Sequence, residues 1–360
     1  MSFASEQLKQ FGWDDWFAAQ ASEKASAEHR IARVVAVDRE QLLVMDDTGE
    51  FRAKLSGRFL HLAEQAVDFP CVGDWVSIQY SGSDMFGVIH DVIPRKSVLR
   101  RKAAGDSIAC QMIAANVDVA LIVQSCHFDF NINRLERYLV MVREGRIDPV
   151  VLLTKTDLVS PETLQQLIET IRSAGIIAAV IALSNVTGEG IDTIREILQS
   201  GKTYCLLGSS GVGKSTLINR LIGRQVLETS VVSGTGEGRH TTVRRELILL
   251  NNGAILIDNP GMREFGILAA EEGMGDSFAD IHALASECRY RDCSHAGEPG
   301  CAVLRAVEEG TLHRAHYQNF LKLRSESEFH DLSYLEKRKK DKAFGRYVKS
   351  AKKDLKNRRK

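Results

Sequence analysis

Apolar and polar positions change their spacing along the chain, and each change predicts a different kind of structure. Between residues 30 and 102 the apolar residues fall in short runs separated by polar or glycine-bearing turns, which is typical of β-strands. The predicted strands are Ile31–Val37, Gln41–Met45, Glu50–Leu55, Asp74–Tyr80 and Phe86–Ile93. About five short strands in this length favour a small barrel of the OB type, which either binds oligonucleotides or serves only for packing. Basic residues after the last strand predict a positively charged exit from the barrel: Arg95, Lys96, Arg100, Arg101 and Lys102.

From Val117 onward, buried-strand runs alternate with helical spacing, which predicts a mostly parallel, doubly wound α/β sheet. The expected strands are Val117–Gln124, Pro149–Leu153, Ile176–Leu183, Tyr204–Leu207, Val243–Leu250 and Ala254–Ile257. The expected helices are Asn133–Arg146, Pro161–Ala174 and Ile191–Leu198, with a further helical pattern after residue 216. Because such sheets bind ligands at the carboxyl ends of their strands, the polar residues that follow the strands are the candidate site.

The two ends of the chain depart from this pattern. The N-terminal residues combine an apolar-aromatic patch with a polar stretch, which predicts one docking helix and a linker. The patch comprises Leu8, Phe11, Trp13, Trp16 and Phe17. From about Ser277 the chain is expected to be helical. We therefore expect an N-terminal extension (1–29), an OB-type barrel (30–102), an α/β domain (103–270), a helical domain (271–336) and a basic tail (337–360).

The net charge of zero conceals the basic tail. Residues 337–360 hold thirteen Lys/Arg and two Asp, a net charge of +11, so the other 336 residues carry −11. Such a tail is either a solvated, partly disordered end that favours solubility or a contact for RNA phosphates, whose binding would weaken with added salt.

Composition excludes several classes of protein. No run approaches 18 uncharged apolar residues and no basic-then-apolar leader begins the chain, so we expect a cytoplasmic protein without a membrane span. The cysteines number seven, and an odd, scattered set argues against a disulfide framework while leaving metal binding open.

The segment after Tyr204–Leu207 matches G-x-x-x-x-G-K-[ST] without a mismatch. A strand, a glycine-rich loop and a helix in this order let backbone N–H groups and a helix N-terminus face a phosphate. Lys214 is expected to reach the β- and γ-phosphates, and the Ser215 hydroxyl is expected to bind Mg²⁺. The predicted phosphate-binding residues are Gly208, Ser209, Ser210, Gly211, Val212, Gly213, Lys214, Ser215 and Thr216.

An Asp-x-x-Gly arrangement follows farther along the chain. Asp258 ends an apolar strand, and its carboxylate can hold Mg²⁺ through water, while the Gly261 N–H can face a γ-phosphate. Between the two motifs the glycine-rich segment Ser233–Thr242 predicts a mobile loop. Its Thr241 or Thr242 can supply a second ligand to Mg²⁺.

Thr154, Lys155, Thr156 and Asp157 lie at a predicted strand end, where a nucleotide base would be bound. A carboxylate there can accept hydrogen bonds from N1–H and the exocyclic amine of guanine, and adenine would leave it unpaired. The stem of Lys155 can cover the plane of the base. The alternative is an ordinary polar turn.

Cys288, Cys293, His295 and Cys301 offer three sulfurs and one imidazole within 14 residues. This is a complete tetrahedral set for a structural zinc ion with no open position for catalysis, and the alternative is buried cysteines beside a surface histidine. The remaining cysteines stand in strand-like or isolated apolar contexts and are interpreted as core or incidental residues: Cys71, Cys110, Cys126 and Cys205.

The order of these motifs carries a resemblance. Thr154–Asp157 looks like a variant of the Asn-Lys-x-Asp guanine box of GTPases, and Ser184 lies where the adjoining box belongs, yet both precede the phosphate loop. This order is a circular permutation that leaves the motifs at one edge of the sheet. With a barrel before it and the Cys/His cluster after it, the chain resembles the RsgA family of ribosome small-subunit-dependent GTPases. Further matches are Val72–Trp75, Ala115–Asp118, Gly238–Thr242 and Glu298–Cys301.

The resemblance implies a fold of an OB-type barrel, a circularly permuted α/β P-loop GTPase and a helical zinc-binding domain, in which the four Cys/His residues are the zinc ligands. It implies a GTP hydrolase that binds the small ribosomal subunit and its rRNA late in maturation. The subunit would stimulate hydrolysis of GTP to GDP, and hydrolysis would drive release. We expect a monomer. The alternatives are a P-loop phosphotransferase acting on a small molecule and a zinc-bearing RNA-binding module with a vestigial nucleotide site.

Three positions depart from the GTPase pattern. Thr154 replaces the Asn that normally braces the base and the phosphate loop, so looser nucleotide binding is expected. Asn259 replaces the usual Thr of Asp-Thr-Pro-Gly, which is a mild change because this position is not a metal ligand. Met262 stands where many GTPases carry a Gln that orients the attacking water, and a thioether cannot do this. Slow intrinsic turnover is therefore expected, with His240 as the internal candidate for positioning water and a plain loop contact as its alternative.

Overall fold

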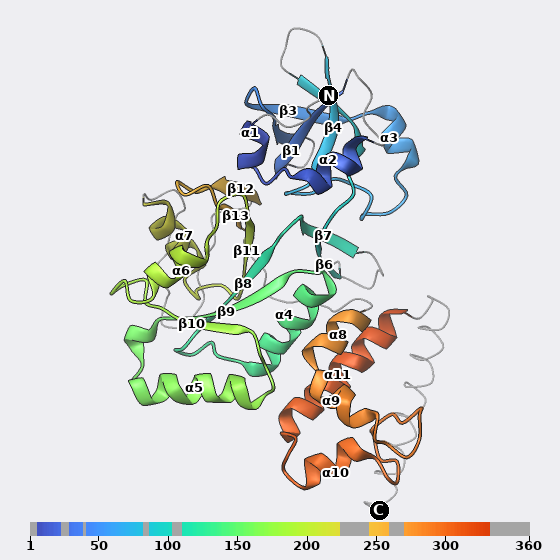
Figure 1. The fold of residues 1–360 in the computed structure, drawn as a ribbon, viewed down its shortest axis with the longest axis vertical. Helices are drawn as coiled ribbons and strands as arrows, with labels where there is room; N and C mark the ends of the chain where they lie inside the picture. The colour runs from blue at the N-terminus through green and yellow to red at the C-terminus, as the bar shows by residue number, and fades with distance from the viewer. Residues whose placement is uncertain are drawn as a thin grey trace, which may run out of the picture.

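The computed structural model describes residues 6–22, 29–38, 41–81, 86–102, 110–223, 245–258 and 270–331. Along the longest axis the barrel lies at one end, the α/β domain lies in the middle and a group of helices lies at the other end (Figure 1). This is the succession of domains that the sequence predicted.

The first domain is a closed barrel of five strands. They are β1 (Arg30–Val37), β2 (Leu42–Met45), β3 (Glu50–Leu55), β4 (Trp75–Ser81) and β5 (Phe86–Val92). The order β1-β2-β3-β5-β4 closes by pairing of β4 with β1 and includes one parallel pair, β3 with β5. The predicted OB-type barrel is confirmed. A helix that the sequence did not predict, α3 (Gly57–Leu62), follows β3, and the Ser56 hydroxyl caps it by accepting from the Phe59 N–H at 3.1 Å.

The N-terminal segment forms two short helices, α1 (Glu6–Gln10) and α2 (Asp15–Ser22), where the sequence predicted one. The break falls at Gly12, whose φ of +83° belongs to the left-handed region, and the Asp14 carboxylate then accepts from the N–H groups of Trp16 and Phe17. The predicted docking is confirmed, because Leu8, Trp13 and Phe17 are buried in one cluster with residues of the barrel.

The segment after the barrel is a β-hairpin, where the sequence predicted only a basic exit. It consists of β6 (Val98–Lys102) and β7 (Cys110–Ala115). Leu99 is fully buried while the neighbouring Arg100 is partly exposed, as in a β-strand with one buried face. The sequence pattern did not predict this strand because the segment contains several charged residues.

The second domain is built on five parallel strands in the order β10-β9-β8-β11-β13, with β12 antiparallel at the edge. The strands are β8 (Val119–Ser125), β9 (Asp148–Thr154), β10 (Ala179–Ala182), β11 (Thr203–Leu207), β12 (Glu246–Leu249) and β13 (Ile255–Asp258). The helices are α4 (Ile132–Glu144), α5 (Pro161–Ser173), α6 (Ile191–Ile197) and α7 (Lys214–Ile222), with a 3₁₀ turn, η1 (Thr156–Leu158). Residues of α4 and α5 pack in one core cluster and residues of α6 and α7 in another, which confirms the doubly wound prediction.

The barrel and the α/β sheet share hydrogen bonding, because β1 pairs antiparallel with β12 at Ala36 and Glu246. The fully buried Arg33 ties this junction together. Its guanidinium donates to the Thr203 hydroxyl at 2.8 Å and to the carbonyl oxygens of Phe11, Gly73 and Asn116. One side chain thus links the N-terminal helices, the barrel and the α/β domain.

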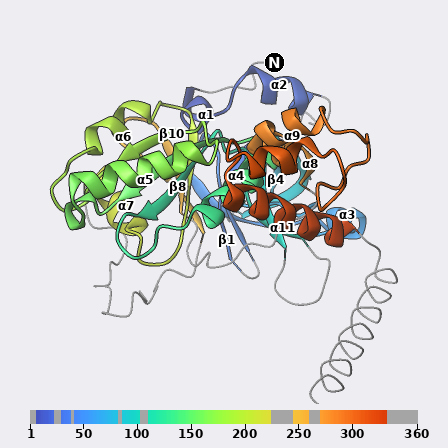
Figure 2. The same ribbon diagram turned by 90° about the horizontal axis from the view of Figure 1, so that it is seen from below.

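The third domain contains α8 (Glu271–Ser277), α9 (Ala279–Ala285), α10 (Ala302–Glu308) and α11 (Arg314–Asp331), so helix begins six residues before the predicted position. Val140 of α4 belongs to the apolar core of these helices, together with Phe278 and Phe320. The helix α4 therefore lies between the α/β domain and the C-terminal helices (Figure 2).

A buried polar network crosses this boundary. His316 of α11 hydrogen-bonds Glu136 of α4 through Nδ1 and Asp280 of α9 through Nε2 at 3.2 Å, and Asn319 donates to the second oxygen of Glu136. Burial acts to lower the pKa of His316, but the hydrogen bonds and charges of Asp280 and Glu136 outweigh it and raise the pKa to about 9.

We expect the stability of this boundary to fall in alkaline solution. Because the pKa of His316 is higher in the folded protein than the ordinary 6.5, its contribution is complete below pH 6.5 and is lost as the pH rises through about 9. The rise in the pKa of His316 from 6.5 to about 9 corresponds to about 3 kcal/mol of stability at most. The free energy of unfolding in urea, measured at pH 6.5, 8 and 9.5, tests this expectation. His316→Gln should remove most of the pH dependence, and an equal decrease of the unfolding free energy with pH in both proteins would contradict the role of His316.

Candidate functional site at the carboxyl edge of the sheet

The phosphate-loop motif connects β11 to α7, as predicted. Gly208 has a φ of +150°, and a Cβ there would overlap the carbonyl oxygen of Val123 in β8. Gly213 has a φ of +100°, and a Cβ there would lie 2.9 Å from the amide nitrogen of Asn185. These two positions therefore require glycine, because the loop is held close against its neighbours. Gly213 is the N-cap of α7 and makes no side-chain cap, which leaves the helix N-terminus facing the loop.

Lys214 is only 4% exposed, and its ammonium group folds over the loop. Nζ donates to the carbonyl oxygens of Gly208 at 2.8 Å and Ser209 at 2.6 Å. Burial lowers the pKa of Lys214 to about 8, and the negative charges of Asp258 and Asp129 oppose that shift. A buried ammonium group at the mouth of a glycine-rich loop is suited to binding a phosphate.

Asp258 ends β13, the strand next to β11, and is 3% exposed. Ser215 and Thr216 are in the first turn of α7, where Ser215 is half-buried and Thr216 is exposed. The other predicted residues of this group lie outside the described residues: His240, Thr241, Thr242, Asn259, Gly261 and Met262.

The predicted base-binding residues follow β9. The Thr154 hydroxyl is buried and donates to the carbonyl oxygen of Val212 in the phosphate loop at 2.6 Å. Lys155 adopts the left-handed conformation, with a φ of 60°, and Thr156 and Asp157 form the 3₁₀ turn η1. A threonine at position 154 therefore still braces the phosphate loop.

The residue expected in the adjoining box lies beside them. Ser184 donates from its hydroxyl to the Asp157 carboxylate and accepts from the N–H groups of Val186 and Thr187, each at 3.1 Å. The structure thus brings together Thr154–Asp157, Ser184, Gly208–Thr216 and Asp258 at one edge, although they are spread over 105 residues.

Two residues at this edge were missed by sequence reasoning. Asn185 follows Ser184 and donates to the carbonyl oxygen of Gly213 at 3.1 Å. Asp129 follows β8 and pairs with Arg134 at 2.8 Å, and its charge acts on Lys214. Both are polar residues just after a parallel strand, and that position was the signal that could have identified them.

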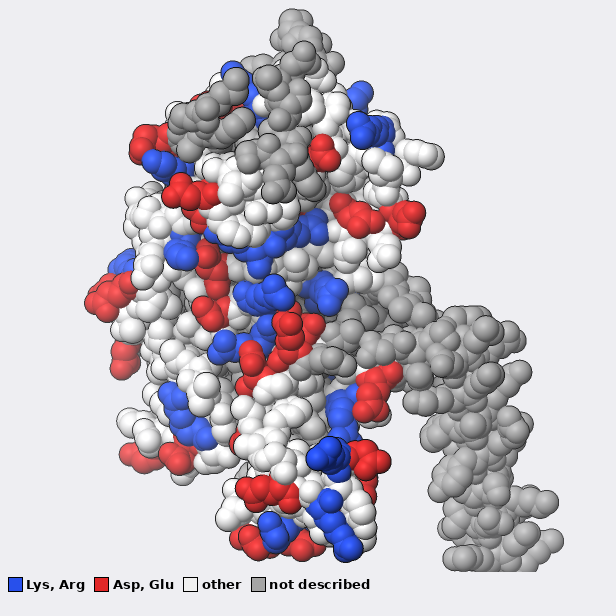
Figure 3. Space-filling model, turned by 45° about the vertical axis from the view of Figure 1, so that its right-hand side comes forward, with Lys and Arg blue, Asp and Glu red and all other residues white. Residues whose placement is uncertain are grey.

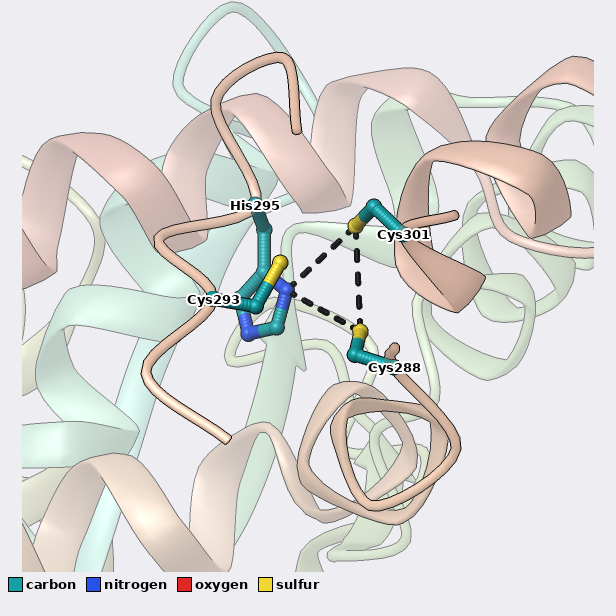
Figure 4. Close-up of side chains that lie close together, drawn as sticks. All are labelled: Cys288, Cys293, His295 and Cys301. Carbon is teal, nitrogen blue, oxygen red and sulfur yellow. Dashed lines mark hydrogen bonds between the residues drawn. The ribbon is translucent and has the colours of Figure 1, made fainter. Parts of the chain in front are cut away.

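The Cys/His cluster lies in the C-terminal domain. The side chains of Cys288, Cys293, His295 and Cys301 point toward one another, and their ligand atoms all lie within 4.8 Å (Figure 4). His295 has a φ of 60°, and its carbonyl oxygen accepts from the Tyr317 hydroxyl at 2.6 Å. Backbone N–H groups of Ala302 and Leu304 donate to the sulfurs of Cys288 and Cys301. This group could hold a tetrahedral metal ion.

The other cysteines lie apart from this cluster. Cys71, Cys126 and Cys205 are buried, as expected for core residues, and Cys110 is half-buried. Within the described ranges, no helix combines the length and apolar character needed to cross a bilayer.

The fold and this edge define a P-loop GTPase domain with circularly permuted motifs, flanked by a barrel and a helical domain whose Cys/His group could hold a metal ion. The model of the family described as "RsgA GTPase" matches residues 92–268. The "Small ribosomal subunit biogenesis GTPase RsgA" of Opitutus terrae is 40% identical over 89% of this chain and 90% of its own length. The "Small ribosomal subunit biogenesis GTPase RsgA 1" of Bacteroides thetaiotaomicron is 38% identical over 98% of this chain and 99% of its own. The chain belongs to the RsgA GTPase family, so the resemblance and the GTP hydrolase class are confirmed.

Two solved structures agree with the fold. "Crystal structure of YjeQ from Thermotoga maritima" has a TM-score of 0.60 and 26% identity, and it covers 82% of this chain and 97% of its own. "The crystal structure of YloQ, a circularly permuted GTPase" has a TM-score of 0.59 and 25% identity, and it covers 86% of this chain and 99% of its own. The predicted permutation therefore has a counterpart in a known structure.

Proposed function

We propose that this protein is a GTPase that binds the small ribosomal subunit, assists its late maturation and leaves after hydrolysing GTP. The observation that carries the proposal is the similarity, over nearly the whole chain, to relatives named small ribosomal subunit biogenesis GTPases. It acts in the cytoplasm as a monomer.

In the nucleotide site, Asp157 and Ser184 select guanine, and Lys155 covers the base. The loop from Gly208 to Thr216 holds the phosphates of GTP or GDP, and Ser215, Asp258 and Thr241 or Thr242 hold Mg²⁺. Lys214 and the Gly261 N–H stabilise the charge that develops on the transferred phosphate, and His240 positions water. The buried Lys214 beside Asp258 supports this division of roles, because both charges lie at the phosphate end of the edge.

The Cys/His cluster holds one structural zinc ion. A tetrahedral zinc ion with Zn–S of about 2.3 Å and Zn–N of about 2.0 Å requires S···S edges of about 3.8 Å and S···N edges of about 3.5 Å. The Cys288–Cys301 sulfurs are 3.8 Å apart, and the His295 Nδ1 lies 3.6 Å from Cys288 and 3.5 Å from Cys301. These distances support zinc bound through Nδ1 of His295.

The barrel, the helical domain and the tail at 337–360 bind rRNA. A band of Lys and Arg side chains crosses the middle of one face, between the barrel and the C-terminal helices (Figure 3). The strand β6 of the hairpin carries Arg100 and Arg101. Cations gathered between two domains suit a polyanion that contacts both, and such binding weakens steeply with salt.

The decisive measurement is GTP turnover by the purified protein with and without small ribosomal subunits. We expect slow turnover alone, because Met262 cannot orient water, and at least about a hundredfold stimulation by the subunit. Large subunits serve as the control. Equal turnover with and without small subunits would refute the proposed partner. A phosphorylated small-molecule product would instead support a phosphotransferase, and failure to bind guanine nucleotide would support a vestigial site.

A further inference from the structure

The phosphate loop is hydrogen-bonded to the two loops that follow β9 and β10, which are called the base-side loops here. The contacts are made by residues 154 and 185. The Thr154 hydroxyl donates to the carbonyl oxygen of Val212 at 2.6 Å and also lies 3.2 Å from that of Gln124. A hydroxyl has one proton to donate, and two carbonyl oxygens already compete for it. Thr154 therefore has no donor left for a nucleotide base. Whatever a side-chain amide would contribute at this position has to come from another residue.

Asn185 brings an amide to the same loop from the neighbouring strand end. Its Nδ2 donates to the carbonyl oxygen of Gly213 at 3.1 Å, one residue beyond the acceptor of Thr154. The orientation of the amide is fixed, because turning it over would place Oδ1 against a carbonyl oxygen. The backbone oxygen of Asn185 accepts a hydrogen bond from Arg220 of α7, so both the phosphate loop and the helix after it are hydrogen-bonded to this residue.

Two buried polar atoms at the base-side loops have no hydrogen-bond partner among the described residues. They are Oδ1 of Asn185 and the hydroxyl oxygen of Thr156. Asn185 also retains a second amide proton beyond the one that Gly213 accepts. Leaving buried polar atoms unpaired costs about 1–3 kcal/mol each, so the polar side chain of Asn185 is kept at this position at a cost to stability.

We propose that Asn185 supplies the amide that the guanine box of this chain lacks at Thr154. It is a positioning residue that holds the phosphate loop at Gly213 in register with Asp157, while Thr154 holds the same loop at Val212. The two residues are in close contact, because a Cβ at Gly213 would lie 2.9 Å from the amide nitrogen of Asn185. This inference rests on the proposed guanine-nucleotide site.

The test measures GDP affinity, using a fluorescent GDP analogue and the full chain with Mg²⁺ and zinc. Asn185→Ala should weaken binding about tenfold, the loss of one to two hydrogen bonds. Adding Thr154→Asn to Asn185→Ala should restore affinity to within about threefold of wild type, because it returns an amide to the same loop. Thr154 lies at the end of β9, whereas Asn185 follows β10. If Asn185 had only a structural role, an amide introduced at position 154 would not restore GDP affinity.

Asn252→Ala is the matched control. The Asn252 amide also donates to a carbonyl oxygen, that of Leu198 at 2.8 Å, but in a turn away from the nucleotide site. Its replacement should leave GDP affinity unchanged. If Asn185→Ala fails to fold, Asn185→Asp keeps the size of the side chain and removes the donor, and it should bind GDP at least tenfold more weakly than wild type.

The outcomes separate the two proposals. If wild type binds no guanine nucleotide, the proposed function fails. If wild type binds GDP and Asn185→Ala or Asn185→Asp binds equally well, the role of Asn185 is refuted. The same conclusion follows if both Asn185→Ala and Asn252→Ala lose affinity equally, or if Thr154→Asn restores nothing.

Discussion

Replacing Lys214 with alanine is expected to weaken GTP and GDP binding at least about a hundredfold and to lower hydrolysis about a thousandfold or more. Lys214 is 4% exposed, and its ammonium group already hydrogen-bonds the loop carbonyl oxygens of Gly208 and Ser209, so it is held where phosphates would bind. Alanine removes the charge and leaves Asp258 and Asp129 to repel an anion. Equilibrium binding of a fluorescent nucleotide and single-turnover hydrolysis measure the two effects.

The matched control is Lys202→Ala. Lys202 pairs with Asp118 at 3.0 Å, near the amino ends of β8 and β11, and is far more exposed than Lys214. Its removal should change nucleotide affinity less than about twofold, as expected for a surface ion pair. A Lys214→Ala protein that binds GTP as wild type does would remove the phosphate loop from the proposed site.

The same lysine predicts a pH dependence of binding. Because the pKa of Lys214 is lowered to about 8, its ammonium form is complete well below that pH and is lost as the pH rises through it. The phosphates require the charged form, so affinity should fall between pH 7 and 9. The Lys214→Ala protein gives the baseline, and a slope identical to that of wild type would exclude this cause.

Removing the proposed zinc ion is expected to have the second large effect. Cys301→Ser should abolish stoichiometric zinc and destabilise the C-terminal domain by at least about 5 kcal/mol, since structural zinc binding is also folding energy. Cys301 is 5% exposed, lies in the apolar core of the helices and accepts from the Leu304 N–H at the start of α10. Loss of the ion would therefore loosen α10 as well as the loop between Cys288 and Cys301.

Elemental analysis and thermal unfolding followed by circular dichroism test this expectation. Wild type should hold one zinc ion per chain, and a strong chelator should reproduce the effect of Cys301→Ser. Cys110→Ser, at a half-buried cysteine outside the cluster, should keep both the metal and the stability. A Cys301→Ser protein with full zinc content would mean that the four residues are not the ligand set.

The helix α4 and the loop before it contact both the candidate nucleotide site and the C-terminal helices. The loop before α4 carries Asp129, whose charge acts on Lys214, while Glu136 on the same helix contacts His316 of α11. One helix with its preceding loop thus joins the surroundings of Lys214 to the C-terminal helices. This contact does not depend on the segment at 259–269 that joins the two domains in sequence.

The sequence by itself predicted the candidate chemistry and much of the local structure. The phosphate loop, the guanine box and the Cys/His cluster were predicted from residue types at fixed spacing, because the groups that each would use for binding lie close together in the chain. Hydrophobic periodicity predicted the barrel and the alternating α/β elements, since burial of one face sets the spacing of apolar residues. It failed at β6, where charge hid a strand, and at Gly12, where a left-handed glycine divides one apolar patch between two helices.

Only the tertiary structure decided the contacts between residues that are far apart in sequence. Thr154 hydrogen-bonds to Val212, and Asn185 hydrogen-bonds to Gly213. These contacts form because the strand order places β9 and β10 on the same side of β11, the strand before the phosphate loop. Spacing along the chain does not encode strand order. The pairing of β1 with β12, the four partners of Arg33 and the link between Glu136 and His316 arise in the same way. Local patterns reflect local conformational preference and burial, whereas these contacts depend on how complete elements pack against one another.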